Sequence, residues 1–232
     1  MNLNFLKIFF RNLKKNKLIS AINILGLTIG ILSSLFILEY VFYERSYDNY
    51  HENGSQVCRV VYNRYQNEKF QWKTANSFFP TGQWLKDHYH EVEDWAVIIM
   101  KYNITVNYEN LVGDKIFNNE IKTYYASSSL FSMFTIPFVQ GVPTCLDQPN
   151  TVAISERAAK RYFGKENPIG KILTVNSTEK YTVTAVYHNI PANSHFKSDF
   201  LFSLPTYTSG QEWLLTNWGG TISTPTLGLH QA

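Results

Sequence analysis

One uncharged apolar stretch near the start of the chain constrains this protein more than any other feature. From Leu18 to Leu38, about 21 residues pass without an Asp, Glu, Lys or Arg. As a helix, such a stretch matches the thickness of the hydrocarbon core of a bilayer. The sequence therefore predicts a retained transmembrane helix over residues 18–43.

Two other kinds of segment resemble such a stretch. A cleaved secretory signal has an apolar core of about 7–15 residues and a cleavage site between small residues. Here the run is longer, and "ILEYVFYER" after it offers no such site. A helix buried in a soluble protein is usually shorter and amphipathic. Both alternatives stay open from the sequence, with the membrane span favoured.

The residues that flank the stretch predict its orientation. Four of the cationic residues before it, which we expect to act as topology anchors, are Arg11, Lys14, Lys15 and Lys17. No acidic residue precedes Glu39. Positive flanks stay in the cytoplasm, so we expect a cytoplasmic N-terminus and the body of the chain on the far side of the membrane. After the stretch, Tyr40, Phe42 and Tyr43 match an interfacial aromatic belt.

Residues 1–17 form a basic leader. Phe5 and Phe9 fall on one stripe of a helix, whereas Lys7 and Arg11 fall on the other side. This is the pattern of a helix that lies in the cytoplasmic headgroup layer. A basic leader without that structure is an equally good interpretation, and the sequence leaves both open.

Small residues recur inside the apolar stretch. Gly26, Gly30 and Ser34 are four residues apart and therefore share one helix face. In lipid, helices associate where small side chains let the backbones approach. We expect this face to pack against another transmembrane helix. The competing explanation is that glycine is simply frequent in membrane helices.

Residues 44–232 have the pattern of a mixed α/β domain. Runs rich in β-branched and aromatic residues predict strands within residues 57–65, 70–78, 94–108, 115–127, 152–154, 171–175, 180–190 and 199–206. Short helices are predicted near residues 80–89, at 128–134 from a serine cap, and from Glu156, with Ser155 as cap and Gly164 as terminator. Strands and helices do not alternate strictly, so the fold class that we predict is α+β.

Motifs that would carry chemistry are incomplete. "GKENPIGK" has five residues between Gly164 and Gly170, where a phosphate loop has four, and Ile172 follows Lys171 in place of Ser or Thr. His88 and His90 stand among acidic residues, but residues two apart on a helix do not face each other. Ser194 and His195 are adjacent, which does not make a nucleophile and base. We therefore expect no enzyme, no cofactor and no metal site.

The charge distribution and the cysteine content further limit the functional class of the protein. The net charge of +3 is concentrated in the head of the chain, which argues against a nucleic-acid surface. Cys58 and Cys145 are far apart and form no metal or redox motif. Outside the cytoplasm they can form a disulfide. Two separate buried thiols are the simpler alternative.

Several segments together resemble one family. These segments are "RNLKKNKLISAINILGLTIGI", "YERSYDNYHENGSQVCRVV", "LFSMFTIPFVQG", "PNTVAISERAAKRYFGKENPIGKILTV", "YTVTAVYHNIPANSHFKSDFLFS" and "NWGG". The chain resembles the amino-terminal part of FtsX-like permeases of ABC transporters, the MacB-type group, and in particular the large Bacteroidetes-type permeases. The resemblance runs the length of the chain.

The resemblance implies a fold and a function. It implies one transmembrane helix, then a mixed α/β MacB-like periplasmic core domain over residues 44–232, in the bacterial inner membrane. A partner ATPase would hydrolyse ATP on the cytoplasmic side, and the periplasmic domain would transmit the conformational change to export a substrate. Family members export peptides, antimicrobial peptides included, macrolides, toxins or lipoproteins, or regulate cell-wall hydrolases.

The chain differs from the family pattern in having no second span before Ala232. We therefore expect it to be a permease subunit or its amino-terminal fragment. The alternative is a single-pass, membrane-anchored binding or scaffolding module without transport activity.

Overall fold

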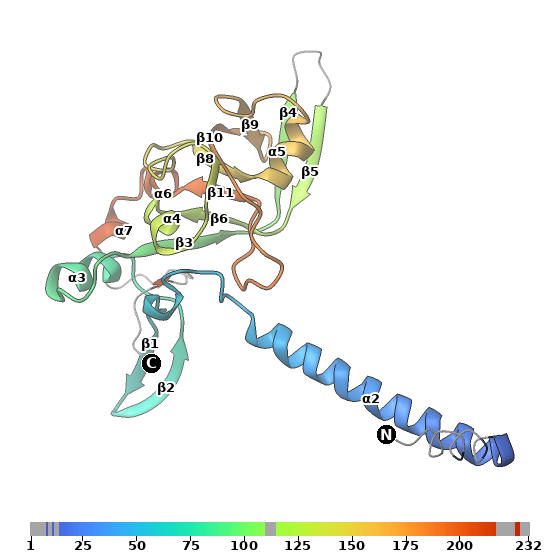
Figure 1. Cartoon of the computed structure of the whole chain (residues 1–232). Helices are drawn as coiled ribbons and strands as arrows, with labels where there is room; N and C mark the ends of the chain where they lie inside the picture. The colour runs from blue at the N-terminus through green and yellow to red at the C-terminus, as the bar shows by residue number, and fades with distance from the viewer. Residues whose placement is uncertain (1–7, 9–10, 12–13, 110–114, 217–225, 228–232) are drawn as a thin grey trace. The chain divides into compact units, whose positions relative to one another are not determined.

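The computed structural model describes residues 8, 11, 14–109, 115–216 and 226–227. They fall into two compact units, Met1–Tyr47 and Asp48–Ala232. Helix α2 belongs to the first unit, and the other labelled helices and strands belong to the second (Figure 1). Each unit is described by itself.

The first unit is dominated by one long helix, α2 (Lys17–Arg45). Its 29 residues include no buried side chain, and at about 1.5 Å per residue it exceeds the ~30 Å hydrocarbon core of a bilayer. It is long and apolar enough to cross a membrane. It covers the predicted span at 18–43 and extends it by one residue at the start and two at the end.

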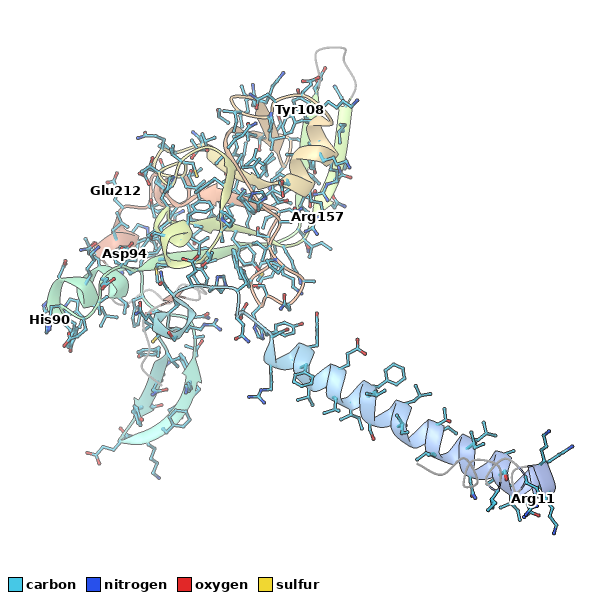
Figure 2. All side chains as sticks on the ribbon, viewed as in Figure 1. Arg11, His90, Asp94, Tyr108, Arg157 and Glu212 are labelled. Atoms are coloured by element: carbon cyan, nitrogen blue, oxygen red, sulfur yellow. The ribbon has the colours of Figure 1, made fainter. Side chains whose placement is uncertain are left out.

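Of the basic leader, only some residues are described. Residues 8, 11, 14 and 15 are helical and exposed, and Figure 2 shows Arg11 near the N-terminal end of α2. The stripe of Phe5 and Phe9, with Lys7 opposite, lies outside the described residues.

The second unit is built on one mixed sheet. Its strands are β3 (Ala96–Lys101), β4 (Ile104–Glu109), β5 (Lys115–Glu120), β6 (Thr123–Ala126), β7 (Phe138–Gln140), β8 (Thr151–Ser155), β9 (Ile172–Val175), β10 (Glu179–Tyr187), β11 (Phe200–Ser203) and β12 (Thr226–Leu227). Among the described residues these ten strands run in the order β12-β3-β6-β11-β8-β10-β9-β4-β5, with β7 also paired to β10. Only β8 with β10 and β6 with β11 pair in parallel. The α+β prediction is confirmed.

The sheet is buried on both faces at its centre. Along β8, Val152 and Ile154 join one hydrophobic cluster and Ala153 joins the other, as expected where successive side chains point to opposite faces. Helix α4 (Ser129–Met133) contributes to the cluster that holds Ala153. Helix α5 (Glu156–Phe163) contributes to the other. Strands β8 and β11 are buried throughout because both faces are covered.

Helix α5 forms where its sequence predicts it. The Ser155 hydroxyl accepts a hydrogen bond from the Ala158 amide at 3.1 Å, which is the expected cap. At the other end, Gly164 takes a positive φ of 61°, a conformation that glycine adopts without steric cost. Glu156 in the first turn and Arg161 in the last match the helix dipole.

Smaller elements surround the sheet. They are the 3-10 helix η1 (Gly54–Gln56), the two-stranded ribbon β1 (Tyr62–Gln66) with β2 (Lys69–Thr74), and the helices α3 (Thr81–His88), α6 (Leu204–Thr208) and α7 (Trp213–Thr216). Leu204 and Leu214 from α6 and α7 join a third apolar cluster with Val97 of β3.

Two local predictions are wrong. The strand expected from residue 57 begins only at Tyr62, because residues 57–61 have irregular backbone with a single bridge at Arg59. Ser128 precedes α4 as expected, but its hydroxyl does not cap this helix. It accepts a hydrogen bond from the Leu146 amide at 3.2 Å instead, and so fastens a distant loop to the start of α4.

Candidate functional site

The small-residue face of α2 is open in the structure. Gly26, Gly30 and Ser34 line a shallow groove of about 420 Å³ with Leu27, Ile31 and Leu35. A methyl group built at Gly26 or Gly30 meets no other atom within 4 Å. The glycines therefore serve no packing within the described chain, and their face is available to another helix.

Three hydroxyl groups in the middle of α2 are satisfied inside the helix. Thr28, Ser33 and Ser34 each donate to the carbonyl four residues earlier, at 2.7, 2.8 and 2.9 Å. Polar groups in lipid need such partners, because no water is present to replace them. These three hydroxyl groups therefore stay paired when the helix lies in an apolar environment.

The chain enters the sheet unit through a cluster that we name the entry clamp: Asp48, Tyr50, Ser194 and His195. The Ser194 hydroxyl donates to Asp48 Oδ1 at 2.9 Å, and the His195 amide donates to the same oxygen at 3.0 Å. His195 Nδ1 lies 2.7 Å from Asp48 Oδ2. Tyr50 donates to Ser194 Oγ at 3.2 Å. One carboxylate thus holds two neighbouring residues that lie far along the chain.

The residues next to the entry clamp are fixed as well. The Thr135 amide donates to His51 Nδ1 at 3.2 Å, and the Glu52 amide donates to Thr135 Oγ1 at 2.8 Å. The His51 ring packs edge-on against Phe134 at 4.9 Å. The segment at residues 48–52 is therefore held by two separate loops of the sheet unit.

The electrostatics of this region follow from these contacts. Burial acts to raise the pKa of Asp48, but the hydrogen bonds from His195 and Ser194 outweigh it and leave the pKa below its ordinary value. Burial lowers the pKa of His51, which is 8% exposed. At neutral pH the clamp thus holds a charged Asp48 beside a neutral His51.

A second polar cluster continues from the same loop to α5. Asp199 accepts hydrogen bonds from the Ser155 hydroxyl at 2.6 Å and from the Arg157 guanidinium at 2.8 Å. Arg157 lies in the first turn of α5 (Figure 2). The loop from residue 193 to residue 199 therefore connects the entry clamp to the start of α5 through specific hydrogen bonds.

The clamp does not have the geometry of a catalytic triad. In a triad the imidazole stands between the hydroxyl and the carboxylate. Here the Ser194 hydroxyl and the His195 ring both contact Asp48. Among the described residues, no group of three or more His, Cys, Asp or Glu side chains is placed to hold a metal ion. His88 stacks on Trp84 at 4.2 Å, and His90 is exposed.

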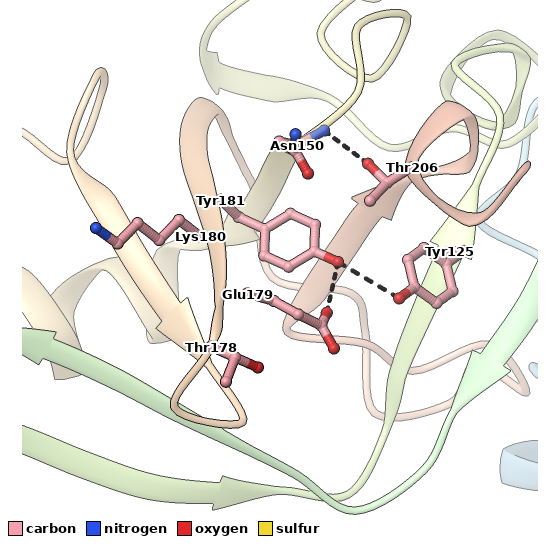
Figure 3. Close-up of a pocket in the computed structure, with 7 residues that line it drawn as sticks. All are labelled: Tyr125, Asn150, Thr178, Glu179, Lys180, Tyr181 and Thr206. Atoms are coloured by element: carbon pink, nitrogen blue, oxygen red, sulfur yellow. Dashed lines mark hydrogen bonds between the residues drawn. The ribbon is translucent and has the colours of Figure 1, made fainter. Parts of the chain in front are cut away.

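A pocket of about 470 Å³ opens beside the ends of β6 and β10 (Figure 3), lined by Tyr125, Asn150, Thr178, Glu179, Lys180, Tyr181 and Thr206. The Tyr181 hydroxyl donates to Glu179 at 2.8 Å, and the Lys101 ammonium contacts Glu179 and donates to Tyr125 at 2.7 Å. These charged and phenolic groups satisfy one another. We assign the cluster a structural role.

Cys58 and Cys145 are both buried and both free thiols in the structure. Burial raises the pKa of Cys145 to about 12, so its thiol is protonated and unreactive at neutral pH. A disulfide between these two residues stays a prediction.

Comparison with known families decides the identity. Residues 20–224 match the sequence model of the MacB-like periplasmic core domain. The chain belongs to this family. The match includes most of α2, the entry clamp and every strand of the sheet except β12, which follows residue 224. The family resemblance of the sequence is therefore confirmed.

Solved structures agree with the MacB-like fold. A domain of a putative permease protein from Porphyromonas gingivalis superposes with a TM-score of 0.62 at 19% identity, covering 78% of this chain and 76% of that one. The periplasmic region of MacB from Actinobacillus actinomycetemcomitans gives 0.51 at 16% identity, covering 80% and 77%. The extracellular domain of the noncanonical ABC-type transporter YknZ from Gram-positive bacteria gives 0.51 at 13% identity, covering 75% and 83%. A comparison with curated proteins found no match.

Membership in the MacB-like family has direct consequences. It makes the sheet unit a permease periplasmic domain and not a catalyst, in agreement with the prediction of no enzyme. It places the chain in the context of ABC transporters. It also gives a periplasmic domain that follows a helix long enough to cross a membrane.

No local pattern in the sequence predicts the entry clamp. Ser194 and His195 are adjacent, which does not make a catalytic pair, and the sequence alone suggests no role for Asp48. The available signal was indirect: "YDNYH" and "ANSHF" both lie in segments that carry the family resemblance. These two segments lie far apart in the sequence, and no local pattern shows that they are in contact.

Proposed function

We propose that this chain is a permease subunit, or the amino-terminal part of one, in a MacB/FtsX-like ABC transporter that exports a substrate. The observation that carries the proposal is the direct succession of two parts. A helix of membrane-spanning length ends at Arg45, and Asp48 already belongs to the entry clamp of a MacB-like periplasmic core domain.

In this proposal α2 crosses the bacterial inner membrane with its N-terminal end in the cytoplasm. Arg11, Lys14, Lys15 and Lys17 precede or begin the helix and fix this orientation, since cationic flanks are retained on the cytoplasmic side. The sheet unit then faces the periplasm. Tyr40, Phe42 and Tyr43 are exposed near the end of α2, which suits the opposite headgroup layer.

The open face of α2 would pack against another transmembrane helix. Gly26 and Gly30 leave the backbone uncovered, and the Ser34 hydroxyl is already bonded to the Gly30 carbonyl. A neighbouring helix can therefore approach closely without leaving a polar group unpaired. The partner helix would come from the same permease or from a second copy.

A partner ATPase would supply the energy. ATP-driven movement of the membrane helices would reach the sheet unit at residues 46–48, where α2 gives way to the entry clamp. From there the loop at residues 193–199 leads to Asp199 and the start of α5. This is a contiguous set of hydrogen bonds, and coupling along it is part of the proposal.

Hydrogen exchange on the assembled transporter tests the proposal. The complete permease with its copurifying ATPase is placed in nanodiscs, with and without a nonhydrolysable ATP analogue. We expect amide exchange to change together at residues 48–52 and 193–199. The β4–β5 hairpin, at the opposite end of the strand order from β12, serves as internal control.

A complex whose sheet unit shows no change in exchange on nucleotide binding would contradict coupling through the clamp. Failure of the chain to copurify with any ATP-binding subunit or further membrane helix would favour the alternative, a single-pass anchored binding or scaffolding module.

A further inference from the structure

The ribbon β1–β2 is an unusual element of the sheet unit. Within the described part of the chain its two strands pair only with each other, and it stands clear of the ten-stranded sheet in Figure 1. None of its residues from Tyr62 to Thr74 in the two strands is buried. An isolated two-stranded hairpin is marginally stable in water. The ribbon is therefore expected to contact something beyond its own domain.

The exposed surface of the ribbon is rich in aromatic side chains. Tyr65 and Phe70 pair across the strands with ring centroids 5.9 Å apart and are 61% and 55% exposed. Arg64 pairs with Trp72, and its guanidinium lies 5.8 Å from the indole. The register of the ribbon shifts between Arg64 and Tyr65, so an irregularity separates these two pairs.

The ribbon and its approach are also cationic. Residues 57–74 contain four basic residues, Arg59, Arg64, Lys69 and Lys73, and one acidic residue, Glu68. The rest of residues 48–232 contains 11 basic and 15 acidic residues. Positive charge in the sheet unit is therefore concentrated on this exposed element. The rest of the sheet unit has more acidic than basic residues.

We propose that the β1–β2 ribbon binds the anionic headgroup layer of the membrane that holds α2. This inference rests on the proposed membrane span. Tyr and Trp rings favour the headgroup level, and Lys and Arg near the surface attract anionic lipid. The exposed aromatic rings and the net positive charge of the ribbon match both features of such a layer.

The chain length is compatible with this contact. Sixteen residues separate Arg45, at the end of α2, from Tyr62, at the start of β1. Fully extended they would span at most about 60 Å. The linker is therefore long enough for the ribbon to reach the surface of the membrane that holds α2.

A polarity-sensitive fluorophore at the tip of the ribbon tests the proposal. The full chain carrying Gln66→Cys is labelled with a nitrobenzoxadiazole maleimide and reconstituted in nanodiscs of phosphatidylcholine with or without phosphatidylglycerol. The same chain without Gln66→Cys gives the background from the buried thiols of Cys58 and Cys145. Co-elution of chain and nanodisc reports on the membrane span separately.

We expect a blue shift and at least a twofold gain in emission in the anionic nanodiscs, reversed by high salt. The triple variant Arg64→Gln, Lys69→Gln, Lys73→Gln should abolish the gain. The matched triple variant Lys122→Gln, Lys165→Gln, Lys180→Gln removes the same charge from exposed positions elsewhere and should retain it.

Three results would overturn the inference. Equal, water-like emission in both lipid compositions would show a tip that does not bind lipid. A blue shift that is independent of lipid charge and salt would indicate a protein contact, to another copy or another partner. A chain that does not co-elute with nanodiscs would remove the membrane span and this inference together, whereas the first two results leave the span intact.

Discussion

At the scale of single residues, the structure shows how one carboxylate organises the entry to the sheet unit. Asp48 has a positive φ of 55°, a conformation that Asp tolerates better than most residues. Both of its oxygens are used by Ser194 and His195. Ser194 is 1% exposed and is the most deeply buried member of the clamp.

Replacing Ser194 should weaken the sheet unit. Ser194→Ala removes the acceptor of the Tyr50 hydroxyl and of the Phe196 amide, and the donor to Asp48. Because buried groups are left unpaired, we expect the free energy of unfolding to fall by about 1–3 kcal/mol. Urea denaturation of the detergent-solubilised chain, followed by tryptophan fluorescence, measures this.

Ser132→Ala, at an exposed position of α4, is the matched control and should cost under about 0.5 kcal/mol. Equal losses in the two variants would contradict the role given to the clamp.

His51 should make the free energy of unfolding fall in mild acid. Its pKa is lowered in the folded chain, so the unfolded chain binds the proton first as pH falls. Stability is therefore lost below the unfolded pKa of about 6.5. His51→Gln keeps an acceptor for the Thr135 amide and cannot titrate. Between about pH 7.5 and about pH 5, its unfolding free energy should fall less than that of the wild type. A wild type and variant with parallel pH profiles would show that His51 makes no contribution.

Asp48 should change the free energy of unfolding in a lower range of pH than His51 does. Because its pKa is lowered by folding, its stabilisation is present above its ordinary pKa of about 3.9 and is lost as pH falls through the lower folded value. The contributions of His51 and Asp48 thus fall in separate windows, and a single profile of unfolding against pH distinguishes them.

At the scale of elements, α5 and α2 illustrate two different kinds of sequence signal. The Ser155 cap, the Gly164 terminator and the charges of α5 are local and were predicted correctly. The hydroxyl of Ser155 is also bonded to Asp199, 44 residues away, which no local pattern contains. An element can therefore be predicted from sequence while its connections cannot.

Loss of the α5 cap should be costly because the same hydroxyl has two roles. Ser155→Ala leaves the Ala158 amide unsatisfied and removes a hydrogen bond to Asp199. We expect a loss of about 1–2 kcal/mol in unfolding free energy. Ser209→Ala, at the exposed C-terminal end of α6, is the control. A Ser155→Ala chain with wild-type stability would show that neither bond contributes.

Larger side chains on the small-residue face of α2 should weaken its association with a partner helix. Gly26→Leu with Gly30→Leu fills the groove that we assign to a partner helix. Since close backbone approach is then blocked, association should weaken by about 1–2 kcal/mol, roughly tenfold in affinity. Copurification of the other permease helices from detergent measures the effect. Thr28→Leu adds bulk on the opposite side of α2 and should have no effect, so equal losses would contradict a specific face.

At the scale of the whole molecule, the sequence predicts the class of the fold better than its connections. The long apolar helix, the α+β class and most strands follow from period and composition, because burial on one or both faces imposes those patterns. The entry clamp and the bond from Ser155 to Asp199 do not follow, because they join residues brought together only by the folded sheet. The late start of β1 was missed because the apolar residues before it form irregular structure.

The central claim is that α2 spans the membrane and that the sheet unit lies on the side opposite its cationic end. Labelling of single cysteines with a membrane-impermeant maleimide, in intact cells with a permeabilised outer membrane, tests it most directly. Asn16→Cys precedes α2 and Lys165→Cys lies on the exposed end of the segment after α5. We predict that position 165 is labelled in intact cells and position 16 only after lysis. Labelling of position 16 in intact cells, or of position 165 only after lysis, would contradict the account.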